Sequence, residues 1–148
     1  MTKVLAPGSI AAELVGERCW AVTADARSGL LLHLGRPEPR PWVIENPTLP
    51  TWLQRFRGSR SLFVRSTWQL ARSDEWLDGW DHASRLEGES IVRVTFGHPR
   101  MDLSVAFTGD LLLVVHPRDE PDRPSYTVGL ESVDWTVRGV ATIEQTAR

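Results

Sequence analysis

Apolar and polar residues alternate along several segments of the chain, most regularly in its second half. Val92, Val94 and Phe96 fall on one side of an extended segment, and mostly polar residues fall on the other. The same alternation runs through residues 133–138 and, in the first half, through residues 62–70. Because successive side chains of a strand point to opposite faces, this pattern predicts strands with one buried and one exposed face.

The segment Met101–His116 predicts a β-hairpin. Its two apolar runs are separated by residues 108–110, where Gly109 can take the positive φ angle of a tight turn. His98-Pro99 predicts a bend before the hairpin, because proline has no N–H to donate to a neighbouring strand.

Evidence for helices is limited to two short segments. Ser9–Val15 predicts one helix, with Ser9 as its N-cap and Gly16 at its end. Pro50–Phe56 predicts a further turn or two of helix, with Thr51 as the N-cap. Three segments rich in proline and polar residues predict loops, namely 36–41, 46–50 and 118–124.

A four-residue motif occurs twice, 72 residues apart. Leu14–Glu17 reads LVGE and Leu86–Glu89 reads LEGE, and a β-prone stretch follows each copy. The repeat predicts an internal duplication, with halves at about 10–72 and 82–144. Chance similarity between two β-rich halves is the alternative.

These patterns together predict one mainly β domain over residues 1–148. About eight to ten antiparallel strands are expected in two similar halves, packed as a sandwich or a partly open barrel with one or two short helices. An α+β fold, in which helices cover a sheet, is the alternative.

Charge and cysteine content exclude some classes of function. The formal net charge is −2, which disfavours nucleic-acid binding because phosphate contacts need clustered lysines and arginines. Cys19 is the only cysteine, so no disulfide can form within the chain and a reducing cytoplasm is the expected compartment. No apolar run approaches the length of a membrane span, and no membrane association is expected.

Motifs for catalysis are missing from the sequence, so no catalytic residue, cofactor or metal is predicted. It contains no nucleophile elbow, phosphate-binding glycine loop or dinucleotide fingerprint. Cys19, in a predicted strand beside Trp20, is expected to be a buried and unreactive thiol. His98 and His116 flank the predicted hairpin and could approach each other, but their neighbouring prolines favour two histidines at loop edges.

Seven tryptophans are the unusual feature of the composition. Three fall on apolar strand faces and are expected in the core: Trp20, Trp68 and Trp135. Four lie near turns or prolines and are expected to be partly exposed: Trp42, Trp52, Trp76 and Trp80. The exposed group is expected to act either as interface anchors or as filling between thin layers.

The first candidate binding surface is the turn at Asp78-Gly79. Trp76 and Trp80 flank this turn, and Asp81 follows directly. Aromatic rings beside carboxylates suit a sugar, a cation or an anchor on another protein. The alternative is a solvated turn whose tryptophans cover the edge of the core.

The second candidate surface is the acidic loop formed by Asp119, Glu120 and Asp122. Its charge could steer a basic partner towards the protein. The neighbouring Arg118 and Arg123 partly neutralise that charge, and a solvated loop is the alternative.

One stretch of the sequence resembles proteins of a known kind. Trp68-Gln69-Leu70 is followed by the second LxGE motif, and then by the alternating segment Asp102–Val115. This order resembles small, functionally uncharacterised bacterial proteins, some of which occur among immunity-type and accessory proteins. The resemblance implies a small β-rich accessory protein and assigns no active site.

Two hypotheses for function follow from these features. The first is a non-enzymatic protein-binding module, an immunity-like or accessory factor that acts through its exposed tryptophans and acidic turns. Its partner would be another protein, or a second copy of the chain in a homodimer. The alternative is a small-molecule-binding protein or an enzyme that uses a pocket in the β-structure.

Overall fold

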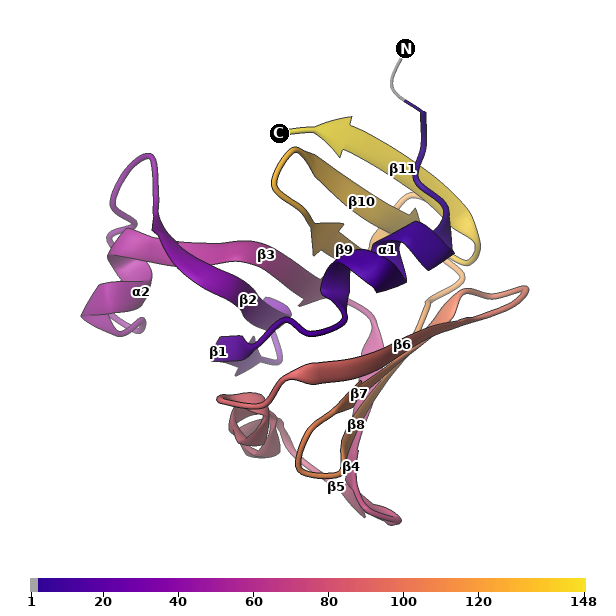
Figure 1. The fold of residues 1–148 in the computed structure, drawn as a ribbon, viewed down its shortest axis with the longest axis horizontal. Helices are drawn as coiled ribbons and strands as arrows, with labels where there is room; N and C mark the ends of the chain where they lie inside the picture. The colour runs from indigo at the N-terminus through magenta and orange to yellow at the C-terminus, as the bar shows by residue number, and fades with distance from the viewer. Residues whose placement is uncertain (1–2) are drawn as a thin grey trace.

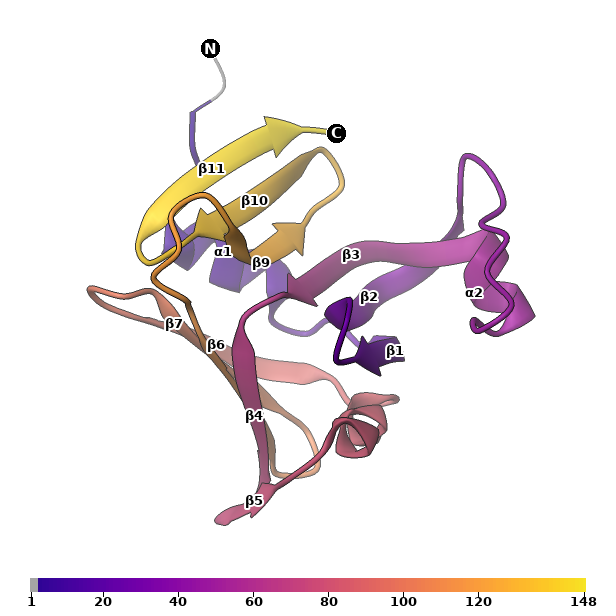
Figure 2. The same cartoon turned by 180° about the vertical axis from the view of Figure 1, so that it is seen from behind.

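Two antiparallel sheets and three short helical segments make up the fold, which Figures 1 and 2 show from opposite sides. The computed structural model describes residues 3–148. The helical segments are α1 (Pro7–Leu14), α2 (Thr51–Arg55) and the 3-10 helix η1 (Trp80–Leu86). The strands are β1 (Cys19–Asp25), β2 (Gly29–Pro39), β3 (Phe56–Val64), β4 (Thr67–Arg72), β5 (Glu75–Leu77), β6 (Ile91–Gly97), β7 (Asp102–Phe107), β8 (Leu111–His116), β9 (Pro124–Gly129), β10 (Val133–Arg138) and β11 (Thr142–Ala147).

The six-stranded sheet has the order β1-β2-β3-β9-β10-β11, and the five-stranded sheet has the order β5-β4-β8-β7-β6. The mainly β prediction is confirmed, with eleven strands in place of the eight to ten expected and with neither sheet closed into a barrel. The predicted hairpin is confirmed as β7 and β8, and Gly109 in its turn has a φ of +75°.

The core lies between the two sheets and follows the predicted alternation on β7, β8 and β10. The prediction is wrong for Val92, which is 53% exposed at a shift in register between Ile91 and Arg93. On β7, Leu103, Val105 and Phe107 are buried while the residues between them are only partly buried. Trp135 of β10 is fully buried, and its Nε1–H donates to the carbonyl oxygen of Leu5 at 3.0 Å. Burial of one aliphatic side chain, such as Leu103 or Val105, stabilises the fold by about 1.5–3 kcal/mol. The interior that the two sheets share therefore dominates stability.

Five strands of each sheet follow the same order, once each strand of one half is matched with its counterpart in the other half. In one sheet β1, β2 and β3 are followed by β9 and β10, and in the other β6, β7 and β8 are followed by β4 and β5. Each half therefore builds three strands of one sheet and completes the other. Figure 2 shows the crossing, where β3 leads into β4 and β8 leads towards β9.

Backbone hydrogen bonds where the halves meet are reciprocal. The N–H of Gly16 donates to the carbonyl of Ile91 at 2.8 Å, and the N–H of Gly88 donates to the carbonyl of Cys19 at 2.7 Å. The two glycines have φ angles of +92° and +88°. The internal duplication stays a prediction, and both this reciprocity and the shared strand order favour it.

Helix starts differ from the prediction. α1 begins at Pro7, so Ala6 and not Ser9 is its N-cap; the fixed φ of proline suits the first position of a helix. In α2 the N-cap is Pro50 and not Thr51, and neither helix has a side-chain cap. The sequence pattern does not predict η1, because so short a 3-10 segment has no long hydrophobic period.

Two other segment predictions need correction. Residues 36–41 are not all loop, because β2 continues to Pro39 after a shift in register, and prolines are tolerated at such bulges. Residues 62–70 are not one strand but the end of β3 and most of β4. The chain turns at residues 65–66, whose two N–H groups both donate to the carbonyl of Ser125 at 2.9 and 3.1 Å.

Gly16→Ala and Gly88→Ala are each expected to lower the free energy of unfolding by about 1–2 kcal/mol, because a side chain at positive φ strains the backbone. A Cβ at Gly16 would have no neighbour within 4 Å, and one at Gly88 would meet only Arg18 at 3.8 Å. Strain and not a clash therefore causes the loss. Urea unfolding at fixed pH measures it.

Gly8→Ala is the matched control, because Gly8 lies in the first turn of α1 with open space around its Cβ position. Alanine favours the helix there, so stability is expected to stay the same or to rise by up to about 1 kcal/mol. A loss at only one of the two turn glycines would contradict their equivalent roles.

Candidate functional site

A cleft with a volume of about 800 Å³ opens beside β4. Its walls are the β1–β2 turn, the end of β3, β4 itself, β5 with the segment leading to η1, and the loop between β8 and β9. These five parts of the chain bring together four aromatic rings and four arginines, namely Phe63, Trp68, Trp76, Trp80, Arg27, Arg65, Arg118 and Arg123.

The aromatic side of the cleft consists of three tryptophans. The rings of Trp68 and Trp80 pack edge to face, with centroids 5.1 Å apart and planes at 83°. Trp76 and Trp80 remain 52% and 39% exposed. Large rings held in place by strand and 3-10 backbone offer apolar area to a ligand at little cost in conformational entropy.

The arginines give the cleft a positive character. Within residues 3–148, no ion pair includes Arg27, Arg65 or Arg118. Arg123 pairs with Glu120 at 3.3 Å, and Asp78 is the one acidic residue of the cleft wall as the structure describes it. Guanidinium groups bind carboxylates through paired hydrogen bonds, so the arrangement suits an anionic ligand.

Two further features characterise the cleft wall, one at Arg65 and one at Ser66. The guanidinium of Arg65 lies over the ring of Phe63, 4.7 Å from its centroid, and this stacking restrains the side chain. Ser66 is 6% exposed, and its Oγ has no hydrogen-bond partner among the described residues. A buried hydroxyl without a partner lowers stability.

Three residues of the predicted turn surface lie in the cleft wall: Trp76, Asp78 and Trp80. Asp81 lies beside them in the first turn of η1 but outside the wall. The predicted exposure of Trp76 and Trp80 is confirmed. The structure therefore brings most of this predicted surface into one site.

The acidic loop lies at the border of the same cleft, but its arginines and not its acidic residues line the wall. Arg118 and Arg123 are in the wall, while Asp119, Glu120 and Asp122 are not. The loop therefore contributes positive charge to the cleft, whereas its composition predicts an acidic surface. An interface through its carboxylates stays a prediction.

Sequence reasoning did not assign Arg27, Phe63, Arg65 or Ser66 to the site, and it expected Trp68 in the core. Phe63, Arg65 and Ser66 directly precede β4 in sequence, and the pairing of β2 with β3 brings the β1–β2 turn with Arg27 beside them. A break between Phe63 and Trp68 is the one local signal, because three adjacent polar residues, Arg65–Thr67, interrupt the apolar alternation there.

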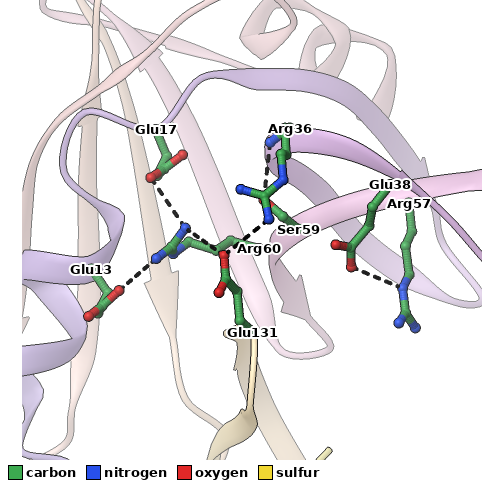
Figure 3. Close-up of polar contacts among 8 residues, drawn as sticks. All are labelled: Glu13, Glu17, Arg36, Glu38, Arg57, Ser59, Arg60 and Glu131. Carbon is green, nitrogen blue, oxygen red and sulfur yellow. Dashed lines mark hydrogen bonds and ion pairs between the residues drawn. The ribbon is translucent and has the colours of Figure 1, made fainter.

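A second polar cluster lies on the other sheet, around Arg60 of β3 (Figure 3). Arg60 reaches Glu13 at 2.8 Å, Glu17 at 3.5 Å and Glu131 at 4.0 Å, and Arg36 reaches Glu131 at 3.5 Å. The hydrogen bond to Glu13, with the charges of the other carboxylates, raises the pKa of Arg60 above its ordinary value. These charges satisfy one another and tie α1 and the β9–β10 turn to β3.

Candidate catalytic and metal-binding residues do not gather into a site. Cys19 is buried, as predicted, and burial raises the pKa of its thiol to about 12, so it is no nucleophile near neutral pH. His116 lies between Asp102 at 3.5 Å and Gln69 at 3.1 Å. Across residues 3–148 no three metal-ligating side chains come together.

This chain matches no protein-family model, no curated protein and no solved structure. None of its described helices has the length and apolar character needed to cross a membrane. The resemblance to small bacterial accessory proteins stays a prediction. The geometry of the cleft therefore carries the functional conclusion.

His33 of β2, which lies outside the cleft wall, provides a pH-dependent test of the packing of the six-stranded sheet. It is buried, its Nδ1 accepts a hydrogen bond from the N–H of Gly58 at 3.1 Å, and burial with the nearby charge of Arg40 lowers its pKa to about 4. An unfolded chain takes up this proton near pH 6.5, as histidine ordinarily does. The free energy of unfolding is therefore expected to fall between about pH 6.5 and pH 4, by about 3 kcal/mol in total.

His33→Gln is the control, because glutamine keeps a hydrogen-bond acceptor and does not titrate. Urea unfolding of both proteins across this pH range isolates the contribution of His33 from that of the carboxylates. Equal pH slopes in the two proteins would show that His33 is not held neutral by burial.

Proposed function

We propose that this protein is a non-enzymatic binding protein whose cleft captures an acidic segment of another protein. One observation carries the proposal. Exposed Trp76 and Trp80 line the same cleft as arginines that form no ion pair with a carboxylate of the described chain. Tryptophan and arginine are the residue types that contribute most to protein interfaces.

The physical basis lies in arginines that form no ion pair within residues 3–148. Arg27, Arg65 and Arg118 are exposed and line one cleft of about 800 Å³. Carboxylates from a partner would form charge-assisted hydrogen bonds with them. The tryptophan rings next to them exclude water, which strengthens those bonds.

Within this proposal the protein acts as an immunity-like or accessory factor of the bacterial cytoplasm. The resemblance to small bacterial accessory proteins supports that role, and the single buried thiol of Cys19 suits a reducing compartment. The acidic loop predicts a basic partner, whereas the arginines of the cleft wall favour an acidic one.

A small anionic ligand is the second candidate. The volume of the cleft, about 800 Å³, lies in the range of small-molecule sites. Such a ligand would combine a planar ring with one or two carboxylates, to match the tryptophans and arginines.

Labelled peptides of about six residues that alternate glutamate with threonine test the proposal. The wild-type protein is expected to bind them, and a matched peptide with lysine for glutamate is expected to bind at least about tenfold more weakly. The double change Trp76→Ala and Trp80→Ala is expected to weaken binding of the acidic peptide by about tenfold or more. Fluorescence anisotropy measures each affinity.

Trp42→Ala is the matched control, because Trp42 is 74% exposed and lies outside the cleft wall. It is expected to leave peptide affinity unchanged, and circular dichroism checks that all variants remain folded. Equal affinity for the lysine and glutamate peptides, or no binding of either, overturns the acidic-segment proposal. Binding of phthalate, a planar dicarboxylate, in place of the peptides would favour the second candidate.

A further inference from the structure

Beside the first half of β4, the five-stranded sheet leaves open a strand position that the six-stranded sheet fills; β11, the sixth strand, has no counterpart either. In the six-stranded sheet, β10 pairs with the whole of β9, from Gly129 to Pro124. In the five-stranded sheet, β5 pairs with β4 only at Leu70–Arg72. The first half of β4 therefore lacks the neighbour that the first half of β9 has.

Thr67, Trp68 and Gln69 form this unpaired stretch. On one side they pair with β8, and on the other side no strand within residues 3–148 meets them. All three residues are in the wall of the cleft. The open edge of the sheet and the cleft are thus the same place.

The pairing of β4 with β5 shows which backbone groups face the cleft. Residues 73–74 form a two-residue turn, so Arg72 and Glu75 are a hydrogen-bonding pair. Alternate residues of an antiparallel strand direct their N–H and C=O to the same side, which assigns Leu70 and then Trp68 to the side of β5. The N–H and C=O of Trp68 therefore point into the cleft.

The strand position beside the first half of β4 is empty because the chain turns away from β4 at Gly79. This residue has a φ of +104°, and the backbone turns there from β5 into η1 instead of continuing along β4. In the other sheet, Thr136–Arg138 occupy the corresponding place as the second half of β10. An exposed strand edge with free N–H and C=O groups is a template for an added strand.

We propose that the acidic segment binds by strand addition, as an extended chain that lies antiparallel to β4 along Thr67–Gln69 and continues the line of β5. This inference rests on the proposed function and specifies how the same cleft recognises its ligand. The main chain of the segment bonds to Trp68, and its carboxylates meet the arginines. Its remaining side chains pack against Trp80.

Charge complementarity selects this occupant. Arg65 and Arg118 line the cleft from the β3–β4 junction and from the β8–β9 loop, and both adjoin the Thr67 end of the open edge, where Thr67 pairs with His116. Because side chains of an extended segment alternate, acidic residues at every second position would face the arginines together. A basic segment would add like charge to a positive cleft.

Single N-methylation of each backbone nitrogen in the acidic peptide tests the proposal. In an added antiparallel strand, only alternate N–H groups point towards β4. Methylation at every second residue is therefore expected to lower affinity by about tenfold or more, and methylation between them to have little effect.

Amide hydrogen exchange provides an independent measurement. The peptide is expected to slow exchange of the Trp68 amide by about tenfold or more, because that amide gains a hydrogen-bond acceptor. The Gln69 amide is the internal control, since it faces β8 and is expected to change little. The lysine peptide is expected to leave both amides unaffected.

The outcomes separate the two proposals. If the acidic peptide binds but every N-methylated form binds equally well, strand addition is wrong and the proposed function stands. If no acidic peptide binds, both are wrong. Protection of the Trp68 amide that rises with protein concentration, in the absence of peptide, assigns the open edge to a second copy of the chain and overturns the acidic-segment proposal.

Discussion

The exchange of strands between the two halves of the chain is the constraint on which the structure depends. β3 pairs with β9, and β8 pairs with β4, so each sheet contains strands from both halves. The apolar faces of the two sheets share one core that includes Trp135, Leu62 and Leu113. The halves cannot separate without breaking ladders in both sheets and exposing that core to water.

The same exchange helps to create the cleft. The pairing of β8 with β4 brings the β8–β9 loop to the edge of β4, and the pairing of β2 with β3 brings the β1–β2 turn there. The two sheets share the order of five strands, but β5 is half as long as β10 and β11 has no counterpart in the five-stranded sheet. The candidate site thus occupies a place where the two halves depart from each other.

Two groups of arginines show how position decides what a charge contributes. Arg60 lies among Glu13, Glu17 and Glu131, and its charge is used within the protein to join neighbouring elements. Arg65 stacks on Phe63, and no carboxylate of the described chain pairs with it. A charge of the first kind stabilises the fold, whereas a charge of the second kind favours an external partner.

The sequence by itself determined the mainly β class, the hairpin around Gly109 and the exposure of Trp76 and Trp80, because alternation and turn residues act over a few neighbouring positions. It did not determine the break at Ser66, the extent of β2 or the positive wall of the cleft. The extent of β2 depends on its pairing with β3, and the other two depend on pairing between the halves. Pairing between distant positions leaves no local pattern in the sequence. Only the tertiary structure set Arg27, Arg65 and Arg118 around one open strand edge.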